Sequence, residues 1–321
     1  MSITVVIQQM VIIFILIAVG MFLYRKEMLS ETTTRQMSGL IVNLTNPALL
    51  ISSALQEGPR MSLQDLGTAL AVDLVIYAVL ILAGFLIPRI LRVPDKYHYA
   101  YQMLTIFGNV GFIGIPLASA VLGTECLIFV SIYNLLYVLL IYTFGISLLQ
   151  RAAAKQADSG ASPQDSAGAQ TDALSWKKMI NAGTISAAVA IILYLGDIPA
   201  PAILSSTLDY IGQTTTLLSM LVLGVSVAQM ALRDIFCHPK LYWFVLLRQI
   251  LLPVVCVLLL RPFLHNELLL HTTALMLAVP AGNMPLMLSK QLQIDTDTIS
   301  QGIILTTLLG LVTIPVVSMI L

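Results

Sequence analysis

Apolar runs of helix length recur along this chain, and they leave few folds open to it. Crossing a hydrocarbon core about 30 Å thick takes roughly 20 residues of helix, and runs of that order occur repeatedly. The composition agrees with this pattern, because 58% of the 321 residues are hydrophobic and only 10% are charged. A soluble domain has too little interior to hide so much apolar surface. The sequence therefore predicts an all-α polytopic membrane protein.

The apolar runs predict ten transmembrane helices, which one polar linker divides into two sets of five. The linker covers residues 151–175, and its small polar residues cannot bury a core. The predicted organisation is a first five-helix repeat over residues 1–150, this linker, and a second repeat over residues 176–321. The expected spans are 3–24, 34–56, 65–91, 98–122, 125–150, 176–195, 202–230, 239–262, 267–292 and 297–321.

Basic residues favour one orientation of these spans, because lysine and arginine are retained in cytoplasmic loops. Thirteen basic residues lie after odd-numbered spans or at their ends, against Arg60 and Arg261 on the other side. We therefore predict a protein of the cell (inner) membrane, with both termini extracytoplasmic and the central linker in the cytoplasm. The thirteen are Arg25, Lys26, Arg35, Arg89, Arg92, Lys96, Arg151, Lys155, Lys177, Lys178, Arg233, Lys240 and Lys290.

An odd number of spans in each half means that the second half enters the membrane inverted relative to the first. The halves also show weak internal similarity. The pair Gly108-Asn109 in the fourth span recurs as Gly282-Asn283 in the ninth, after a shift of 174 residues. Together these observations predict two inverted five-helix repeats.

The fourth and ninth spans are both interrupted by helix-breaking residues. Proline removes a backbone donor and glycine permits non-helical dihedral angles, so backbone polar groups are freed that cannot face lipid. Paired breaks in an inverted repeat are the best sequence indication of a transporter's binding site. The half-helix N-termini would present partial positive charge to a carboxylate, while the asparagines either contact substrate or only cap freed carbonyls. The candidate substrate-binding residues here are Gly108, Asn109, Pro116, Gly282, Asn283 and Pro285.

Further polar residues lie at similar depth in other spans. Asn43 and Asn46 flank the turn before Pro47, where they either line the same cavity or make an interhelical hydrogen bond. The seventh span carries a polar cluster over residues 213–216 and at Ser219. Thr306 and Thr307, with Tyr133 and Asn134, are weaker candidates for the cavity wall.

Asp73 and Arg248 are the two formal charges deep inside spans, and the shift of 174 residues brings them within one position of each other. Intramembrane charges are costly and are functional candidates by default. One possibility is a mutual ion pair. The other is that Arg248 attracts an anionic substrate while Asp73 titrates or coordinates a coupling ion.

Several classes of protein find no support in the sequence. The three cysteines share no close spacing and the four histidines form no ligand pattern, so we predict no disulfide framework and no metal site. The net charge is zero, which gives no indication of a nucleic-acid partner. No phosphate-cradling glycine-rich motif is present, so we expect no ATP and no other cofactor. An intramembrane enzyme would need paired aspartates or a Ser/His pair, and Asp73 has no second deep aspartate, so we expect no enzyme.

Four motifs in this order are similar to those of the auxin efflux carrier family, including its bacterial malonate-transporter-like members. The motifs are IVNLTNPALL, GNVGFIGIPL, LLRQILLP and PAGNMP, and the resemblance covers essentially the whole chain. It implies two inverted five-helix repeats with broken crossover helices 4 and 9. The linker is far shorter than in the long plant carriers, as is typical of the bacterial members. It places Asn109 and Pro116 at the first crossover and Asn283 and Pro285 at the second. The sequence AGNMP departs from the Asn-Pro forms of the plant carriers.

The resemblance also implies a function. The family moves organic acids, namely auxin in plants and malonate, malate or similar carboxylates in bacteria. It uses a scaffold-like part and a moving part, in an elevator type of alternating access, often within a homodimer. We therefore expect a secondary active transporter of a small organic anion, driven by a proton or sodium gradient. A bile-acid-type sodium symporter of the same architecture, or a membrane sensor or channel, are the alternatives.

Overall fold

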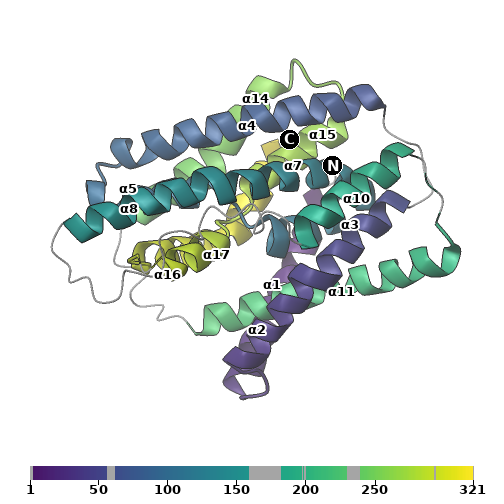
Figure 1. Cartoon of the computed structure of the whole chain (residues 1–321), viewed down its shortest axis with the longest axis horizontal. Helices are drawn as coiled ribbons and strands as arrows, with labels where there is room; N and C mark the ends of the chain where they lie inside the picture. Colours follow the sequence, from purple (N-terminus) through teal and green to yellow (C-terminus); the bar gives the residue numbers. More distant parts are fainter. Residues whose placement is uncertain are drawn as a thin grey trace.

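The computed structural model describes residues 3–55, 62–158, 182–196, 198, 200–229, 239–292 and 294–320 (Figure 1). Within these ranges every regular element is a helix, and one isolated β-bridge joins two loops. Most of the expected linker, from residue 159 onward, lies outside the described residues, as do Arg60, Lys177, Lys178 and Arg233. The described start of the linker is helical, because α8 (Ile146–Asp158) continues past residue 151.

Helices occupy all ten of the ranges in which spans are expected. Six of the described helices are long and apolar enough to cross a membrane, and four shorter apolar helices accompany them. The chain is therefore a helical multi-pass membrane protein, while the count of ten crossings stays a prediction. The remaining α-helices are α1 (Ile3–Arg25), α2 (Glu31–Leu40), α3 (Asn46–Leu55), α4 (Leu63–Ile90), α5 (His98–Ile106), α6 (Ile115–Leu122), α7 (Leu127–Leu140), α10 (Ala182–Gly196), α11 (Ala202–Ala228), α13 (Pro239–Val245), α14 (Leu252–Leu260), α15 (Glu267–Ala278), α16 (Met284–Gln291) and α17 (Asp297–Ile320).

Short π-helical segments interrupt several of these helices without ending them. They are η1 (Ile41–Thr45) between α2 and α3, η3 (Val110–Gly114) before α6, η5 (Ile141–Gly145) between α7 and α8, and η6 (Leu246–Leu251) between α13 and α14. Three of them end two residues before a proline, at Pro47, Pro116 and Pro253. A proline cannot donate to the preceding turn, so the turn widens to the π pattern instead of breaking.

The helices pack as two groups. In the first group, α1 lies along α11, and α3 lies between α10 and α11. Glycines let these backbones touch: a Cβ atom on Gly20 would lie 2.5 Å from the carbonyl oxygen of Leu221, and one on Gly212 would lie 2.8 Å from Cα of Leu49. Such close approach through small residues is the usual way that helices associate tightly in a membrane. We call α1, α2–η1–α3, α10 and α11 the glycine-packed group.

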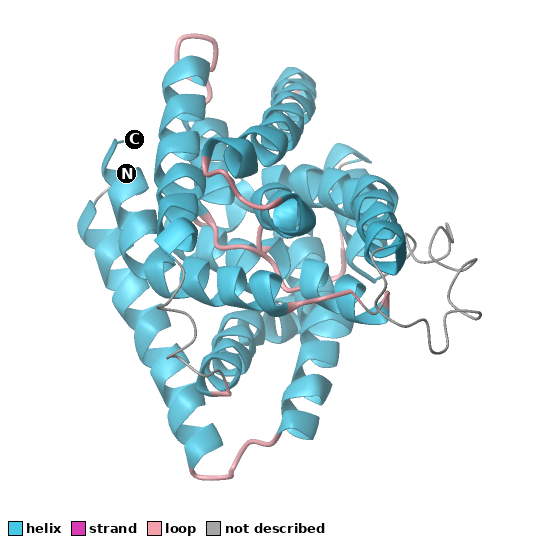
Figure 2. Ribbon diagram, turned by 90° about the vertical axis from the view of Figure 1, so that its left-hand side faces the viewer, coloured by secondary structure: helices cyan, strands magenta, loops and turns pink. Residues whose placement is uncertain are grey.

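The second group contains the two helices that break. Here α4 packs on α5, α14 on α15, and α17 on α5, α15 and η6. It meets the glycine-packed group where α7 lies on α10, α1 on α17, and η3 on α11. Figure 2 shows loop segments running through the inside of the helical assembly as well as at its ends. The two breaks lie in this second group, between α5 and η3 and between α15 and α16.

Candidate functional site

The two breaks pair with each other through their backbones. Gly108 and Ala281 form an isolated antiparallel β-bridge. The N–H of Asn109 donates to the carbonyl of Pro280 at 2.8 Å, and the N–H of Gly282 donates to the carbonyl of Phe107 at 2.9 Å. Backbone groups that the breaks release from helices are thus satisfied across the crossing, as a buried backbone requires.

Glycines at the bridge set how closely the two segments approach. A Cβ atom on Gly282 would lie 2.8 Å from the carbonyl oxygen of Gly108. One on Gly108 would lie 2.9 Å from a methyl group of Val279 and 3.1 Å from the guanidinium of Arg248. Any side chain at either position would push the segments apart, so both glycines serve the crossing itself.

Asn109 caps the half-helix that runs from Val110 through Leu122. Its side-chain oxygen accepts from the N–H of Phe112 at 3.2 Å, and its carbonyl accepts from Gly114 at 2.8 Å. The side chain is buried, with 3% of its surface exposed, and its amide nitrogen Nδ2 has no hydrogen-bond partner. Asn109 therefore fills the capping role with its oxygen and keeps an unpaired donor at the positive end of a half-helix.

Pro116 acts one turn further on. In a π-helical turn the carbonyl of residue i faces the N–H of residue i+5, so Gly111 faces Pro116, which has none. The Gly111 carbonyl instead accepts from the side-chain amide of Asn46 at 2.8 Å. Pro116 thus frees the carbonyl through which the glycine-packed group holds the first break. Asn43, by contrast, is exposed and donates to Gly39 in its own helix, so the structure does not bring it to the site.

The second break carries its predicted residues at the start of α16. Asn283 directly precedes this helix and is partly exposed, and Pro285 is its second residue and is buried. Proline fits the first turn of a helix because the N–H there has no helical partner. Neither residue makes the backbone contacts with the first break, which come from Pro280, Ala281 and Gly282.

Arg248 is held by the backbone of the second break. It is 2% exposed, and its Nη1 atom donates to the carbonyl of Leu277 at 3.1 Å and to the carbonyl of Val279. Leu277 lies in the last turn of α15, and Val279 directly follows the helix. The positive charge of Arg248 therefore complements the negative C-terminal end of the α15 dipole. In the described part of the chain Arg248 makes no ion pair with Asp73, so the proposed mutual pair is wrong for this conformation.

Two neighbours complete the support of the second break. Gln249 donates to the carbonyl of Thr306 at 3.0 Å and, more weakly, to that of Ala278 at 3.5 Å. The hydroxyl of Thr306 accepts from the N–H of Ala281 at 3.2 Å and donates to Gly302 at 2.7 Å. Sequence reasoning missed Gln249, although its place beside Arg248 in a proline-containing span was a usable signal.

Asp73 is a buried residue of α4, in the second group. Its side chain is 3% exposed and its Oδ2 atom has no hydrogen-bond partner. Tyr77, one turn further along α4, stacks with Tyr133, and the two ring centroids lie 4.8 Å apart. Asp73 is therefore a buried acid with a partly unsatisfied carboxyl.

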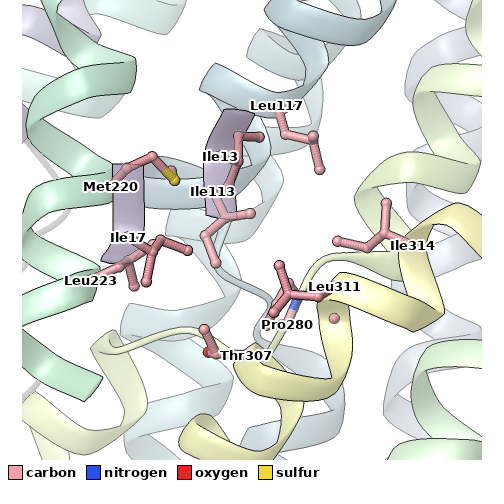
Figure 3. A pocket seen from close by; sticks show the side chains of 11 residues that line it. Ile13, Ile17, Ile113, Leu117, Met220, Leu223, Pro280, Thr307, Leu311 and Ile314 are labelled. Atoms are coloured by element: carbon pink, nitrogen blue, oxygen red, sulfur yellow. The ribbon is translucent and has the colours of Figure 1, made fainter. Parts of the chain in front are cut away.

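A small apolar cavity opens where the crossing meets the glycine-packed group (Figure 3). The space open to the centres of water molecules is about 20 Å³, roughly what one water needs. An organic acid would need the two groups to separate. Its walls come from α1, η3, α6, α11, α17 and the second break, through Ile13, Ile17, Ile113, Leu117, Met220, Leu223, Pro280, Thr307, Gly310, Leu311 and Ile314.

The helices and the paired breaks describe a multi-pass membrane protein with two discontinuous helices that cross at its centre. The family model described as "membrane transport protein" matches residues 5–318, nearly the whole chain. The chain therefore belongs to this family, the auxin efflux carrier family, and is a membrane transport protein. This is a family of transporters rather than of enzymes. No curated protein matches the sequence.

Proposed function

We propose that this protein is a secondary active transporter of a small organic anion, which binds beside the crossing of the two breaks. The observation that carries the proposal is the unpaired Nδ2 of Asn109, buried at the N-terminus of a half-helix. A carboxylate would accept from this amide and benefit from the helix dipole. Gly108 and Gly282 leave room for the crossing, while Asn283 and Pro285 begin the second half-helix beside it.

The proposed cycle is alternating access of the elevator type. The glycine-packed group would serve as the scaffold, since backbone contacts make it a tight unit. The second group, which carries both breaks, would move against it. The boundary between them holds the apolar cavity and the hydrogen bond from Asn46 to Gly111, which must be exchanged as the groups slide. We also propose, from the family resemblance, a homodimer in the cell (inner) membrane with extracytoplasmic termini and a cytoplasmic linker.

Asp73 is the candidate for the coupling ion in this scheme. A buried carboxyl with an unpartnered oxygen is costly unless it takes up a proton or a cation during the cycle. Proton and sodium gradients are both compatible with one carboxyl flanked by two tyrosines. Arg248, whose Nη1 atom is held by backbone carbonyls, would fix the shape of the second break.

Uptake by purified protein in liposomes tests the proposal. Vesicles with an imposed proton or sodium gradient should accumulate labelled organic acids from a panel of mono- and dicarboxylates, and protein-free vesicles should not. Accumulation that appears only with sodium and only for sterol acids would favour the bile-acid-type alternative. Absence of uptake for every acid, with protein that remains monodisperse, would refute the transporter of organic anions and leave a sensor or channel.

A further inference from the structure

Buried polar atoms without hydrogen-bond partners gather around the start of the half-helix at Val110. Each belongs to a side chain that is at most 6% exposed. A buried polar atom normally finds a partner, so a cluster without partners is a place where a ligand or water belongs. The atoms are Oγ1 of Thr45, Oδ1 of Asn46, Nδ2 of Asn109, Oγ1 of Thr215 and Oγ of Ser219.

The first part of this cluster is fixed by a direct contact. Asn46 donates from Nδ2 to the carbonyl of Gly111, so its other amide atom, Oδ1, lies beside the first turn after Asn109. Thr45 is the adjacent residue and the last of η1. Both therefore lie next to the N-terminus of the half-helix.

The geometry of the packed helices places the hydroxyl-bearing residues of α11 at the same depth as Thr45. Gly212 of α11 packs directly against the backbone of Leu49 in α3. Figure 1 shows α11 running opposite to α2 and α3, and α11 packs against η1 and η3 as well as α3. One turn back from Leu49 is Thr45, and one turn on from Gly212 is Thr215, so the two threonines lie at one level.

Ser219 lies one further turn along α11, on the same face as Gly212 and Thr215. The next residue, Met220, lines the apolar cavity together with Ile113 of the half-helix, and Figure 3 shows both side chains at that cavity. The polar cluster and the apolar cavity therefore share a border along α11.

The chemistry of the cluster is that of uncharged donors. Three hydroxyls and one amide could each donate to a carboxylate, and the half-helix N-terminus adds partial positive charge. Arg248 donates through Nη1 to the carbonyls of Leu277 and Val279, while its Nε atom has no hydrogen-bond partner and its Nη2 atom lies beside Gly108, so it is the one formal cation near the cluster in the described part of the chain. Such a set suits one negative charge.

The apolar cavity is unfavourable for a second carboxylate on the substrate. Thr307 is the one polar side chain on its wall, and the rest are aliphatic, Met, Pro or Gly. A carboxylate placed there would lose its water without gaining partners, whereas a hydrocarbon chain would gain by burial. We infer that Thr45, Thr215 and Ser219, with Asn109, hold the substrate's single carboxylate, while its apolar body enters this cavity as the two groups separate. The inference rests on the proposed function, and it favours a monocarboxylate over malonate or malate.

Binding of two five-carbon acids to the purified full chain tests this selectivity. Valerate and glutarate differ in having a methyl group or a second carboxylate at the far end. Isothermal titration in detergent avoids the leak of neutral acids through vesicles. Valerate should bind at least about tenfold more tightly than glutarate. Glutarate binding as tightly as valerate, or more tightly, would overturn the inference and leave the proposed transport of organic anions standing.

Variants of α11 test the assigned hydroxyls. Thr215→Val and Ser219→Ala each remove one donor to a charged acceptor, so each should weaken valerate binding by about tenfold. Thr214→Val is the matched control, because Thr214 is exposed and donates within its own helix, to Ile211. If all three variants bind valerate with the same affinity as the unaltered protein, the hydroxyls of Thr215 and Ser219 do not bind the carboxylate. If no acid of either kind binds or is taken up, the proposed function fails, and this inference fails with it.

Discussion

Replacing Arg248 with methionine separates the two roles that a deep arginine can have in a transporter. Methionine keeps much of the length and volume of the side chain but removes its charge and all its donors. In this structure the lost interactions are the hydrogen bonds to the carbonyls of Leu277 and Val279. The variant therefore leaves two carbonyls unpaired at the end of α15, next to the crossing.

The loss of folding stability in Arg248→Met can be estimated from these two hydrogen bonds. A hydrogen bond that involves a charged group contributes about 1.5–3 kcal/mol, so losing two costs about 3–6 kcal/mol. Arg248→Lys keeps the charge at the helix C-terminus but can reach fewer carbonyls in a fixed geometry, and should cost about half as much. Asp73→Asn should not change the cost of either substitution, since Asp73 does not pair with Arg248.

Thermal unfolding of the purified protein in detergent measures these differences. We expect a large fall in the unfolding midpoint for Arg248→Met, a smaller fall for Arg248→Lys, and additive behaviour when either is combined with Asp73→Asn. A double variant more stable than Arg248→Met alone would show that the two charges do pair. Arg248→Met with unchanged stability but no substrate binding would instead make Arg248 a substrate ligand, contrary to this structure.

Three more predictions follow from the crossing and its surroundings. Gly282→Val should abolish uptake into liposomes, because its Cβ atom would lie 2.8 Å from a facing carbonyl, whereas Gly67→Ala, with nothing within 4 Å, should leave uptake unchanged. Asn46→Leu should slow uptake about tenfold through loss of its bond across the group boundary, and exposed Asn43→Leu should not. Asp73→Asn should remove the dependence of uptake on the imposed ion gradient. The variant should still exchange internal for external substrate when no gradient is imposed. Uptake that depends on the gradient as strongly as in the unaltered protein would exclude Asp73 as the coupling site.

The places where the helices break could be predicted from the sequence because breaking is a local property. Glycine, proline and asparagine act on their own turn, and the interruptions after Ile106 and Ala278 fall beside Gly108 and Pro280. The apolar runs are equally local, so the helical membrane fold followed from them. The bridge that joins the breaks could not be predicted to the residue, since any backbone segment can pair with any other.

The partners of the polar side chains were beyond sequence reasoning for the same physical reason. Arg248 and Asp73 are nearly symmetric in position and opposite in charge, yet the arginine binds carbonyls, and every residue carries a carbonyl. Asn43 and Asn46 are three residues apart, yet only Asn46 reaches the crossing. Asn43 lies within the π-helical turn of η1 and Asn46 directly follows it, so the wider turn changes which face each residue occupies, and nothing in the residue pattern before Pro47 fixes that rotation.

The distribution of satisfied and unsatisfied groups is what connects this fold to transport. In a membrane interior every polar group that only supports the fold should find a partner within the protein. The carbonyls of Phe107, Pro280, Leu277 and Val279 meet this condition through the bridge and Arg248. The amide nitrogen of Asn109 and the hydroxyls of Thr45, Thr215 and Ser219 do not. Because the crossing is already satisfied without them, these donors are free for a ligand that accepts hydrogen bonds at one end and is apolar at the other.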